Sequence, residues 1–226
     1  MNQKNITAVV AVVALIVGVY VAIVIAPPGT TNKDSAETAE VTEYSTQYLQ
    51  RYPQPRALSE AALIDHNQQP FSKQNFENKW SLLFVGYTYC PDICPTTLAE
   101  LNNAYPGIIE TVGDTPLQVV FLSVDPKRDS PERLNEYMNF FNQNFVGVTG
   151  EHAQLFPFVR SMGMMYSMTE STDNPNYLVD HSASVVVINP KAQVIGRFKP
   201  QHSPGKIPIS DSQQIIADLP AIISEG

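Results

Sequence analysis

The sequence predicts an α/β domain preceded by an N-terminal transmembrane helix. Apolar, strand-like runs alternate with segments of helical spacing through residues 56–226. A second observation is an uncharged run near the N-terminus, from Ile6 to Ala26. Hydrophobic residues make up 43% of the chain and charged residues 16%, which suits one globular core and argues against disorder. We therefore expect one folded domain with an N-terminal extension.

The run from Ile6 to Ala26 would span about 31 Å as a helix, which matches the core of a bilayer. The apolar part of a cleaved signal peptide is shorter, about 7–15 residues. Prolines also occupy positions 27 and 28, where a signal peptidase would cut. Residues 6–26 are therefore predicted to be an uncleaved anchor.

Charge on either side of the anchor predicts its orientation. Lys4 precedes it and acidic residues follow Lys33, so the positive-inside rule places residues 1–5 in the cytoplasm and the domain outside. The first arginine is Arg51, whereas a mitochondrial transit peptide would be rich in arginine. The expected location is a bacterial inner (cell) membrane, crossed once, with the domain facing the periplasm.

Residues 27–55 are rich in Thr, Ser, Ala, Glu and Pro and show no sustained apolar period. They are predicted to form a flexible tether with a reach of about 30 Å, which would let the domain move over a neighbour in the membrane. The folded domain is assigned to residues 56–226.

The first half of the domain contains a hairpin and a β-α-β unit. Two short runs around a polar turn predict a hairpin over 63–71. A continuous apolar run predicts a buried strand over 82–87, and a second buried strand is predicted over 117–124. Apolar residues at helical spacing predict a helix from about 95 to 105, which Pro106 should end or kink.

The second half begins with residues 129–132, where Asp, Ser, Pro and Glu are typical of a helix start. Strands are predicted over 184–188 and 192–198, on either side of an Asn-Pro-Lys turn. A closing helix over about 211–219 should stop before Pro220. A parallel β-α-β unit, an antiparallel hairpin and a final helix follow one another in this order in thioredoxin-like folds.

Composition also excludes some functions. The net charge is −8 and no Lys/Arg cluster occurs, which argues against nucleic-acid binding because phosphates require a basic surface. The chain has only two cysteines, Cys90 and Cys94. A small disulfide-stapled scaffold would have more, so the pair predicts a functional site.

The two cysteines lie between the first buried strand and its helix, at the sheet edge where α/β proteins bind ligands. Pro95 suits the first helical turn, which places Cys94 at the helix N-terminus and Cys90 in the loop before it. The helix dipole and its free N–H groups favour a thiolate at Cys94. Oxidised, the pair can form a redox disulfide; reduced, it can chelate a soft metal ion.

His181 is the candidate for a third ligand, because it precedes the buried strand at 184–188. In the predicted fold this strand can lie beside the one leading to Cys90. Two thiolates and an imidazole suit Cu(I) first and zinc second, and three ligands leave a position open for handing the metal on. Asp180 could orient the imidazole from outside the ligand set.

At these residues the chain resembles the Sco (SenC) family. The resemblance is carried by Leu82–Leu98, which contains Cys90-Pro91-Asp92-Ile93-Cys94-Pro95, by Val124–Pro131 and by Val179–Ser182. It covers about residues 54–225. It implies a thioredoxin fold, copper bound by Cys90, Cys94 and His181, and a non-enzymatic role as a copper chaperone. It also implies a partner: subunit II of cytochrome c oxidase, whose dinuclear copper centre such proteins help to build. Many relatives have His before the first Cys, where this chain has Tyr89.

Three other functions would also use the two cysteines. A thiol-disulfide oxidoreductase would use the same cysteines to keep those of the oxidase subunit reduced, although such enzymes usually have two residues between their cysteines. A structural disulfide would stabilise little across so short a loop. A peroxidase is unlike this chain, because Tyr87 and Pro91 stand where peroxiredoxins need Pro and Thr. Copper-handling or thiol-reducing proteins are further expected partners.

Remaining residues with metal-binding chemistry are expected to be structural. We expect four methionines to pack in the core: Met162, Met164, Met165 and Met168. We expect three histidines to lie at the surface: His66, His152 and His202. Asp125, Arg128 and Asp129 are expected to fix a turn and cap the following helix.

Overall fold

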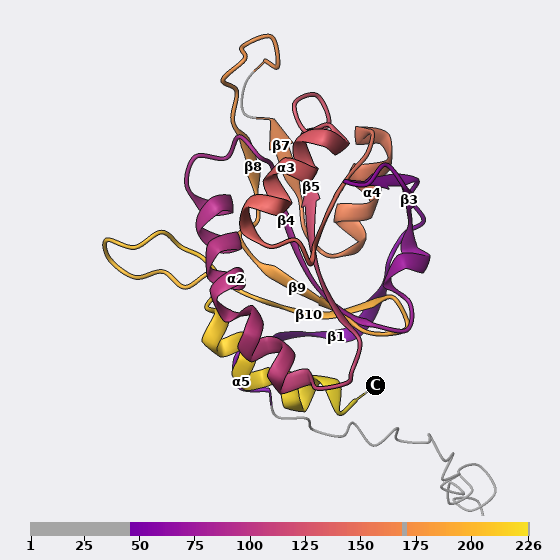
Figure 1. The fold of residues 1–226 in the computed structure, drawn as a ribbon, viewed down its shortest axis with the longest axis vertical. Coiled ribbons are helices and arrows are strands. Elements are labelled where there is room, and N and C mark those ends of the chain that lie inside the picture. The colour runs from indigo at the N-terminus through magenta and orange to yellow at the C-terminus, as the bar shows by residue number, and fades with distance from the viewer. Residues whose placement is uncertain (1–45, 169–170, 226) are drawn as a thin grey trace, which may run out of the picture. The chain divides into compact units, whose positions relative to one another are not determined.

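The computed structural model describes residues 46–168 and 171–225 (Figure 1). The predicted cytoplasmic residues 1–5, the anchor at 6–26 and the tether as far as residue 45 lie outside the described residues. Within the described part of the chain, no helix is both long enough and apolar enough to cross a membrane.

A mixed, eight-stranded sheet forms the centre of the domain. Its strand order is β1-β10-β9-β4-β5-β6-β2-β3. The strands are β1 (Gln50–Ala57), β2 (Leu63–Asp65), β3 (Pro70–Phe71), β4 (Trp80–Gly86), β5 (Leu117–Ser123), β6 (Phe145–Thr149), β9 (Val185–Ile188) and β10 (Gln193–Phe198). β4, β5 and β6 run parallel, whereas β9 is antiparallel to both β4 and β10. All residues of β4 and β9 are buried, as their continuous apolar runs predict.

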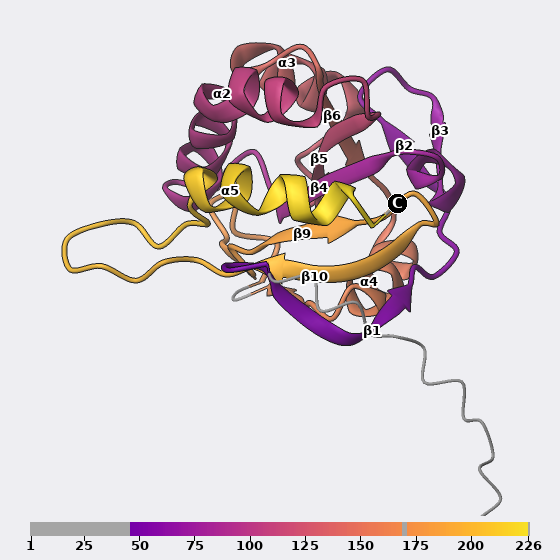
Figure 2. The same cartoon turned by 90° about the horizontal axis from the view of Figure 1, so that it is seen from below.

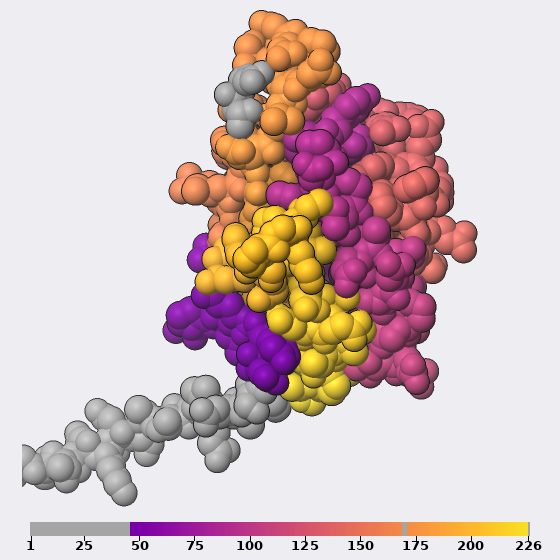
Figure 3. All heavy atoms as spheres, turned by 90° about the vertical axis from the view of Figure 1, so that its left-hand side faces the viewer, coloured from indigo at the N-terminus to yellow at the C-terminus, as the bar shows by residue number. Residues whose placement is uncertain are grey.

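Helices cover both faces of this sheet. They are α2 (Ile93–Val112), α3 (Pro131–Phe141), α4 (His152–Ser161) and α5 (Ser212–Ile223), with a short 3-10 helix η1 (Lys73–Phe76). α2, α3 and α5 lie on one face and α4 on the other (Figure 2). α5 packs along α2, which Figure 3 shows as yellow spheres beside magenta ones. The result is the predicted α/β fold with a central sheet.

Two helices continue through prolines that the sequence predicts to end or kink them. α2 includes Pro106 and runs to Val112, and α5 includes Pro220. An internal proline removes one hydrogen bond and costs about 3 kcal/mol. Beyond these prolines, Ile108 and Ile222 are completely buried. Burying one such side chain contributes about 1.5–3 kcal/mol, which offsets half or more of that cost.

The folded domain begins earlier than the predicted boundary between residues 55 and 56. β1 starts at Gln50 and pairs with β10 along the sheet edge. Ahead of it, the buried Asp218 carboxylate accepts hydrogen bonds from the backbone N–H groups of Gln47, Tyr48 and Leu49, at 2.7–2.9 Å. The last residues assigned to the tether are therefore part of the domain.

Candidate metal centre

Cys90, Cys94 and His181 meet beyond the C-terminal end of β4. Their ligand atoms all lie within 4.8 Å of one another. Cys90 lies in the loop after β4, and Cys94 is the second residue of α2, as predicted. His181 ends β8 (Val179–His181), which forms a two-stranded ribbon with β7 (Tyr166–Met168). This ribbon lies at the same end of the sheet as the C-terminal ends of β4 and β5 (Figure 1).

Hydrogen-bond geometry turns one imidazole nitrogen towards the thiols. Nε2 of His181 lies 3.4 Å from Sγ of Cys94, while Nδ1 lies 3.2 Å from the carbonyl oxygen of Ser182. A proton on Nδ1 can be donated to that carbonyl, which leaves the Nε2 lone pair facing the two sulfurs. The imidazole is therefore oriented as a metal ligand.

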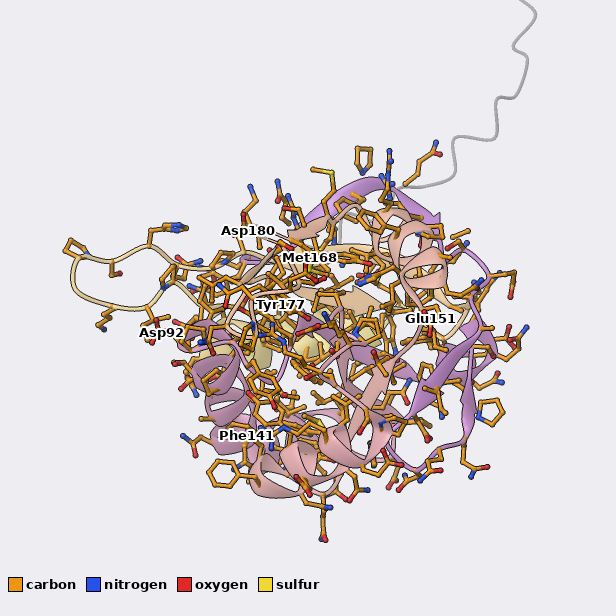
Figure 4. All side chains as sticks on the ribbon, turned by 90° about the horizontal axis from the view of Figure 1, so that it is seen from above. Asp92, Phe141, Glu151, Met168, Tyr177 and Asp180 are labelled. Carbon is orange, nitrogen blue, oxygen red and sulfur yellow. The ribbon has the colours of Figure 1, made fainter. Side chains whose placement is uncertain are left out.

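Asp180 does not have the role that the sequence predicts for it. Consecutive side chains of a strand point to opposite faces, and Asp180 is exposed whereas His181 is half-buried. The carbonyl of Ser182 lies beside Nδ1, where the Asp180 carboxylate would have to be. Figure 4 labels Asp180 on the β7–β8 ribbon. The backbone, and not this carboxylate, orients the imidazole.

The two thiols differ strongly in acidity. Hydrogen bonding with Cys94, and next with His181, outweighs burial and lowers the pKa of Cys90 to about 4. For Cys94, burial is the largest cause of a raised pKa, followed by the neighbouring Cys90. The thiolate is therefore on Cys90 and the proton on Cys94, the reverse of the sequence prediction. The main physical reasons are the side-chain hydrogen bond between the two thiols and the burial of Cys94. The free N–H of Cys94 at the helix start adds to them, because it donates to Cys90 Sγ at 3.4 Å.

Selective alkylation tests this assignment. In the reduced, metal-free protein we expect iodoacetamide to modify Cys90 well before Cys94, because Cys90 is partly exposed and ionised whereas Cys94 is buried and protonated. The Cys90 rate should stay nearly constant between about pH 6 and 8 and fall near pH 4, where the thiolate is protonated. Mass spectrometry of the peptides measures both rates. Faster modification of Cys94, or a Cys90 rate that rises steeply up to pH 8, would contradict the assignment.

Gly86, the last residue of β4, makes room for the buried sulfur. A Cβ atom built on Gly86 would lie 2.6 Å from Sγ of Cys94 and 2.7 Å from the ring of Phe121. A glycine within an apolar strand is the signal in the sequence for such a close approach. The rings of Phe84 and Tyr87 are nearly perpendicular to the imidazole of His181, with centroids 5.9 and 5.8 Å away. The site thus has an apolar wall.

Arg128 connects the segment before His181 to the loop before Cys90. Its guanidinium lies 3.6 Å from the ring centroid of Tyr177 and 4.9 Å from that of Tyr89. It also donates to the carbonyl of Pro175 at 3.1 Å and pairs with the buried carboxylate of Asp125. Asp125 in turn accepts a hydrogen bond from the hydroxyl of Tyr177. Cation-π contacts of this kind are worth about 0.5–2 kcal/mol each, so Arg128 holds the two ligand-bearing segments together.

Asp129 fixes the loop after β4. Its buried carboxylate accepts hydrogen bonds from the backbone N–H of Thr88 at 2.8 Å, the hydroxyl of Thr88 at 2.6 Å and the hydroxyl of Ser123. The backbone carbonyl oxygen of Asp125 accepts hydrogen bonds from the backbone N–H groups of Arg128 and Asp129, so the predicted turn is confirmed. The expected capping role of Asp129 is wrong: the residue that caps α3 is Ser130, whose hydroxyl accepts a hydrogen bond from the backbone N–H of Arg133. Asp129 instead holds the segment that leads to Cys90.

Most of the other methionines and histidines are structural. Met162 and Met164 are buried in the core and Met168 packs against it, as expected, but Met165 is 73% exposed. His202 is exposed. The other two histidines are partly buried: Nδ1 of His66 accepts from the N–H of Gly147, and His152 contacts the hydroxyl of Tyr166.

The donor set fits a soft metal ion. Two sulfurs that are each about 2.3 Å from a metal can be at most about 4.6 Å apart, and the donor atoms here lie within 4.8 Å. Only small shifts are needed to close the site. Two thiolates and one imidazole favour Cu(I) or zinc over hard cations. Three protein ligands leave a coordination position for a donor or an acceptor of the metal.

Comparison with known proteins places this geometry in a family. The sequence model of the SCO1/SenC family matches residues 51–216. An SCO2-like protein of Rickettsia prowazekii is 30% identical over 199 residues, which cover 87% of this chain and 91% of that one. The human mitochondrial SCO2 homolog is 33% identical over 149 residues, which cover 63% of this chain and 56% of that one.

Solved structures agree with the sequence comparison. Copper-bound ScoI of Arabidopsis thaliana has a TM-score of 0.64 and 29% identity, over 75% of this chain and 99% of that one. Copper-bound yeast Sco1 has a TM-score of 0.66 and 25% identity, over 76% of this chain and 91% of that one. The shared fold and the matched sequence lead to one conclusion: the chain belongs to the SCO1/SenC family.

Proposed function

We propose that this protein binds copper through Cys90, Cys94 and His181 and delivers it for assembly of the dinuclear copper centre of cytochrome c oxidase. The convergence of two thiols and an imidazole nitrogen within 4.8 Å is the observation that carries the proposal. The copper-bound structures of two similar proteins support it. The proposed recipient is subunit II of the oxidase, and the protein itself acts as a carrier rather than an enzyme.

The three donors differ in access, and this difference suggests an order of binding. The Cys90 thiolate is partly exposed and ionised, so it can take Cu(I) first. Cys94 then loses its proton as its sulfur joins, because a bound cation favours the thiolate. Nε2 of His181 completes the set. On release, an acceptor would reach the half-exposed Cys90 and His181 first, so the buried Cys94 would be the last ligand to leave the metal.

A membrane anchor would suit such a carrier. We place the uncharged segment 6–26 in the inner membrane of a bacterium, with the folded domain in the periplasm. Residues 27–45 would then tether the domain close to the oxidase, which is itself a membrane protein. The tether would raise the effective concentration of the copper site at its recipient.

A thiol-disulfide oxidoreductase is the second candidate, because the pKa of Cys90 is lowered to about 4 while that of Cys94 is raised. A reactive thiolate beside a protonated thiol is the arrangement that disulfide exchange uses. Such a protein could keep the cysteines of the oxidase subunit reduced. His181 is needed for copper binding and is dispensable for thiol exchange, so it separates the two functions.

Replacement of His181 by alanine therefore tests the proposal. We expect the variant to form and reduce its Cys90–Cys94 disulfide, because exchange needs only a thiolate, a leaving thiol and access. The same variant should lose oxidase activity in cells at limiting copper, with partial rescue by added copper. Thiol titration and oxidase assays on membranes give the two measurements. Wild-type oxidase activity in this strain would contradict copper delivery and favour the oxidoreductase.

A further inference from the structure

Tyr177 is the buried anchor of the segment that leads to His181. Its side chain is 1% exposed, and it is the only buried residue in the stretch 171–178 (Tyr177 is labelled in Figure 4). The β7–β8 ribbon that carries His181 has three residue pairs, and a two-stranded ribbon is only marginally stable by itself. Tyr177 lies four positions before His181, so the groups that hold its ring also help to position the imidazole.

Arg128 and Asp125 hold this ring from the loop between β5 and α3. The guanidinium of Arg128 lies 3.6 Å from the ring centroid, well within the distance of a cation-π contact. The hydroxyl of Tyr177 donates to the carboxylate of Asp125, which is itself paired with Arg128. Arg128 also donates to the carbonyl of Pro175 at 3.1 Å. A single guanidinium therefore contacts the segment before His181 at two points.

The same guanidinium lies beside two rings of the loop that leads to the cysteines. It is 4.9 Å from the ring centroid of Tyr89, which directly precedes Cys90. It is 5.6 Å from the ring centroid of Tyr87. The Tyr87 ring in turn stands nearly perpendicular to the imidazole of His181, with centroids 5.8 Å apart. Arg128 thus contacts aromatic neighbours of both kinds of ligand, the thiol and the imidazole.

We propose that Arg128 is a positioning residue for the metal centre, which acts through Tyr177 to keep the His181 imidazole within reach of copper held by the two thiols. This inference rests on the proposed function. Arg128 is not a ligand, because its guanidinium stays protonated and has no acceptor to offer a metal. Its effect is on order: a ligand that is already in place binds without the free-energy cost of being ordered first. Without Arg128, copper would be held by the thiolates with a poorly placed imidazole.

Arg128→Lys tests this role and keeps a cation beside the buried carboxylate of Asp125. A lysine lacks the planar group that stacks on aromatic rings and the forked donors of a guanidinium. We expect the affinity for Cu(I) to fall at least about tenfold, the lower end of what losing a supporting residue costs a metal site. Competition with a Cu(I) chelator measures it on the full chain in detergent micelles.

A thermodynamic cycle with His181→Ala separates positioning from general damage to the fold. In the His181→Ala background, Arg128→Lys should cause no further loss of Cu(I) affinity, because the group that Arg128 positions is gone. An equal loss in both backgrounds would mean that Arg128 acts on the fold or on the thiols. That result, or wild-type affinity in Arg128→Lys alone, would overturn the proposal.

Imidazole nitrogen NMR shows the ligand itself. In the wild type labelled with 15N-histidine, Cu(I) should shift the Nε2 signal of His181, which is assigned by its loss in His181→Ala. In Arg128→Lys this shift should be smaller or absent. Arg133→Lys is the matched control and should keep the full shift, because Arg133 also lies near the ring of Tyr89, at 5.6 Å, but donates to Thr88 and not to the segment before His181. A full shift in Arg128→Lys would contradict the assigned role.

Tyr177→Leu approaches the same contact from the other side and leaves Arg128 paired with Asp125. It should lose Cu(I) affinity as Arg128→Lys does, and again cause no further loss in the His181→Ala background. Circular dichroism of the metal-free variants checks that both are folded. Wild-type affinity in folded Tyr177→Leu would refute positioning through this ring and leave copper binding by the cysteines intact. Absence of copper binding in the wild type would instead refute the proposed function.

Discussion

Replacing both Cys90 and Cys94 by serine is expected to weaken tight Cu(I) binding by more than about 100-fold, because loss of a residue that only supports a ligand already costs about 10–100-fold. Each single Cys→Ser variant should show a large loss. His181→Ala should lose less than either, because a thiolate is the softer and charged ligand. Competition with a Cu(I) chelator of known affinity gives the ranking.

The serine variants keep nearly the same side-chain volume, so they should still fold. Circular dichroism and thermal unfolding of the metal-free proteins provide this control. The two cysteines are the only ones in the chain, so no other thiol can replace them. Full-strength Cu(I) binding by the folded double variant would place the tight site elsewhere.

Gly86→Ala should have the second large effect, although Gly86 is not a ligand. The new methyl group would lie 2.6 Å from Sγ of Cys94 and 2.7 Å from the ring of Phe121, both of which are buried. Overpacking of this kind typically costs about 1–3 kcal/mol of stability. The Cys94 sulfur must also move, so the affinity for Cu(I) should fall together with the unfolding temperature. Chemical unfolding and chelator competition measure the two effects.

Gly147→Ala is the matched control for Gly86→Ala. Gly147 lies in β6 of the same sheet, and its added methyl would meet Met138 at 2.9 Å and Leu134 at 3.3 Å. We expect this variant to lose stability but to keep wild-type copper affinity, because it crowds no residue of the site. Wild-type affinity in Gly86→Ala, or an equal loss of affinity in both variants, would show that Gly86 does not shape the site.

The sequence predicts the central strands well and the edges poorly. β9 and most of β4 are continuous apolar runs, and β5 contains one over residues 119–122. Such runs indicate strands buried on both faces. β1 is largely exposed and contains two prolines, so no apolar pattern marks it. Its place depends on long-range pairing with β10 and on Asp218, which follows it by about 170 positions.

The elements between α3 and β9 were not predicted. β6 is interrupted by Gly147, and α4 contains Pro157. These residues weaken local signals for a strand and a helix. The ribbon β7–β8 has only three residues per strand. Tertiary contacts stabilise these elements, and a single sequence does not show them.

The candidate site is likewise predicted only in part from the sequence. The identities of Cys90, Cys94 and His181 come from spacing and from the family resemblance, and the structure brings them together. Which cysteine is ionised was predicted wrongly, because burial and hydrogen-bond direction decide it and neither is visible in sequence. The roles of Gly86 and Arg128 likewise depend on close approaches between distant segments.

X-ray absorption spectroscopy of the copper-loaded full chain, combined with metal analysis, tests the central claim most directly. The reduced protein should bind one copper ion per chain with two sulfur ligands and one nitrogen ligand, from Cys90, Cys94 and His181. His181→Ala should remove the nitrogen scattering, and the double cysteine variant should remove the signal of two sulfurs. Copper bound by nitrogen and oxygen alone, or an unchanged spectrum in the double cysteine variant, would contradict the account.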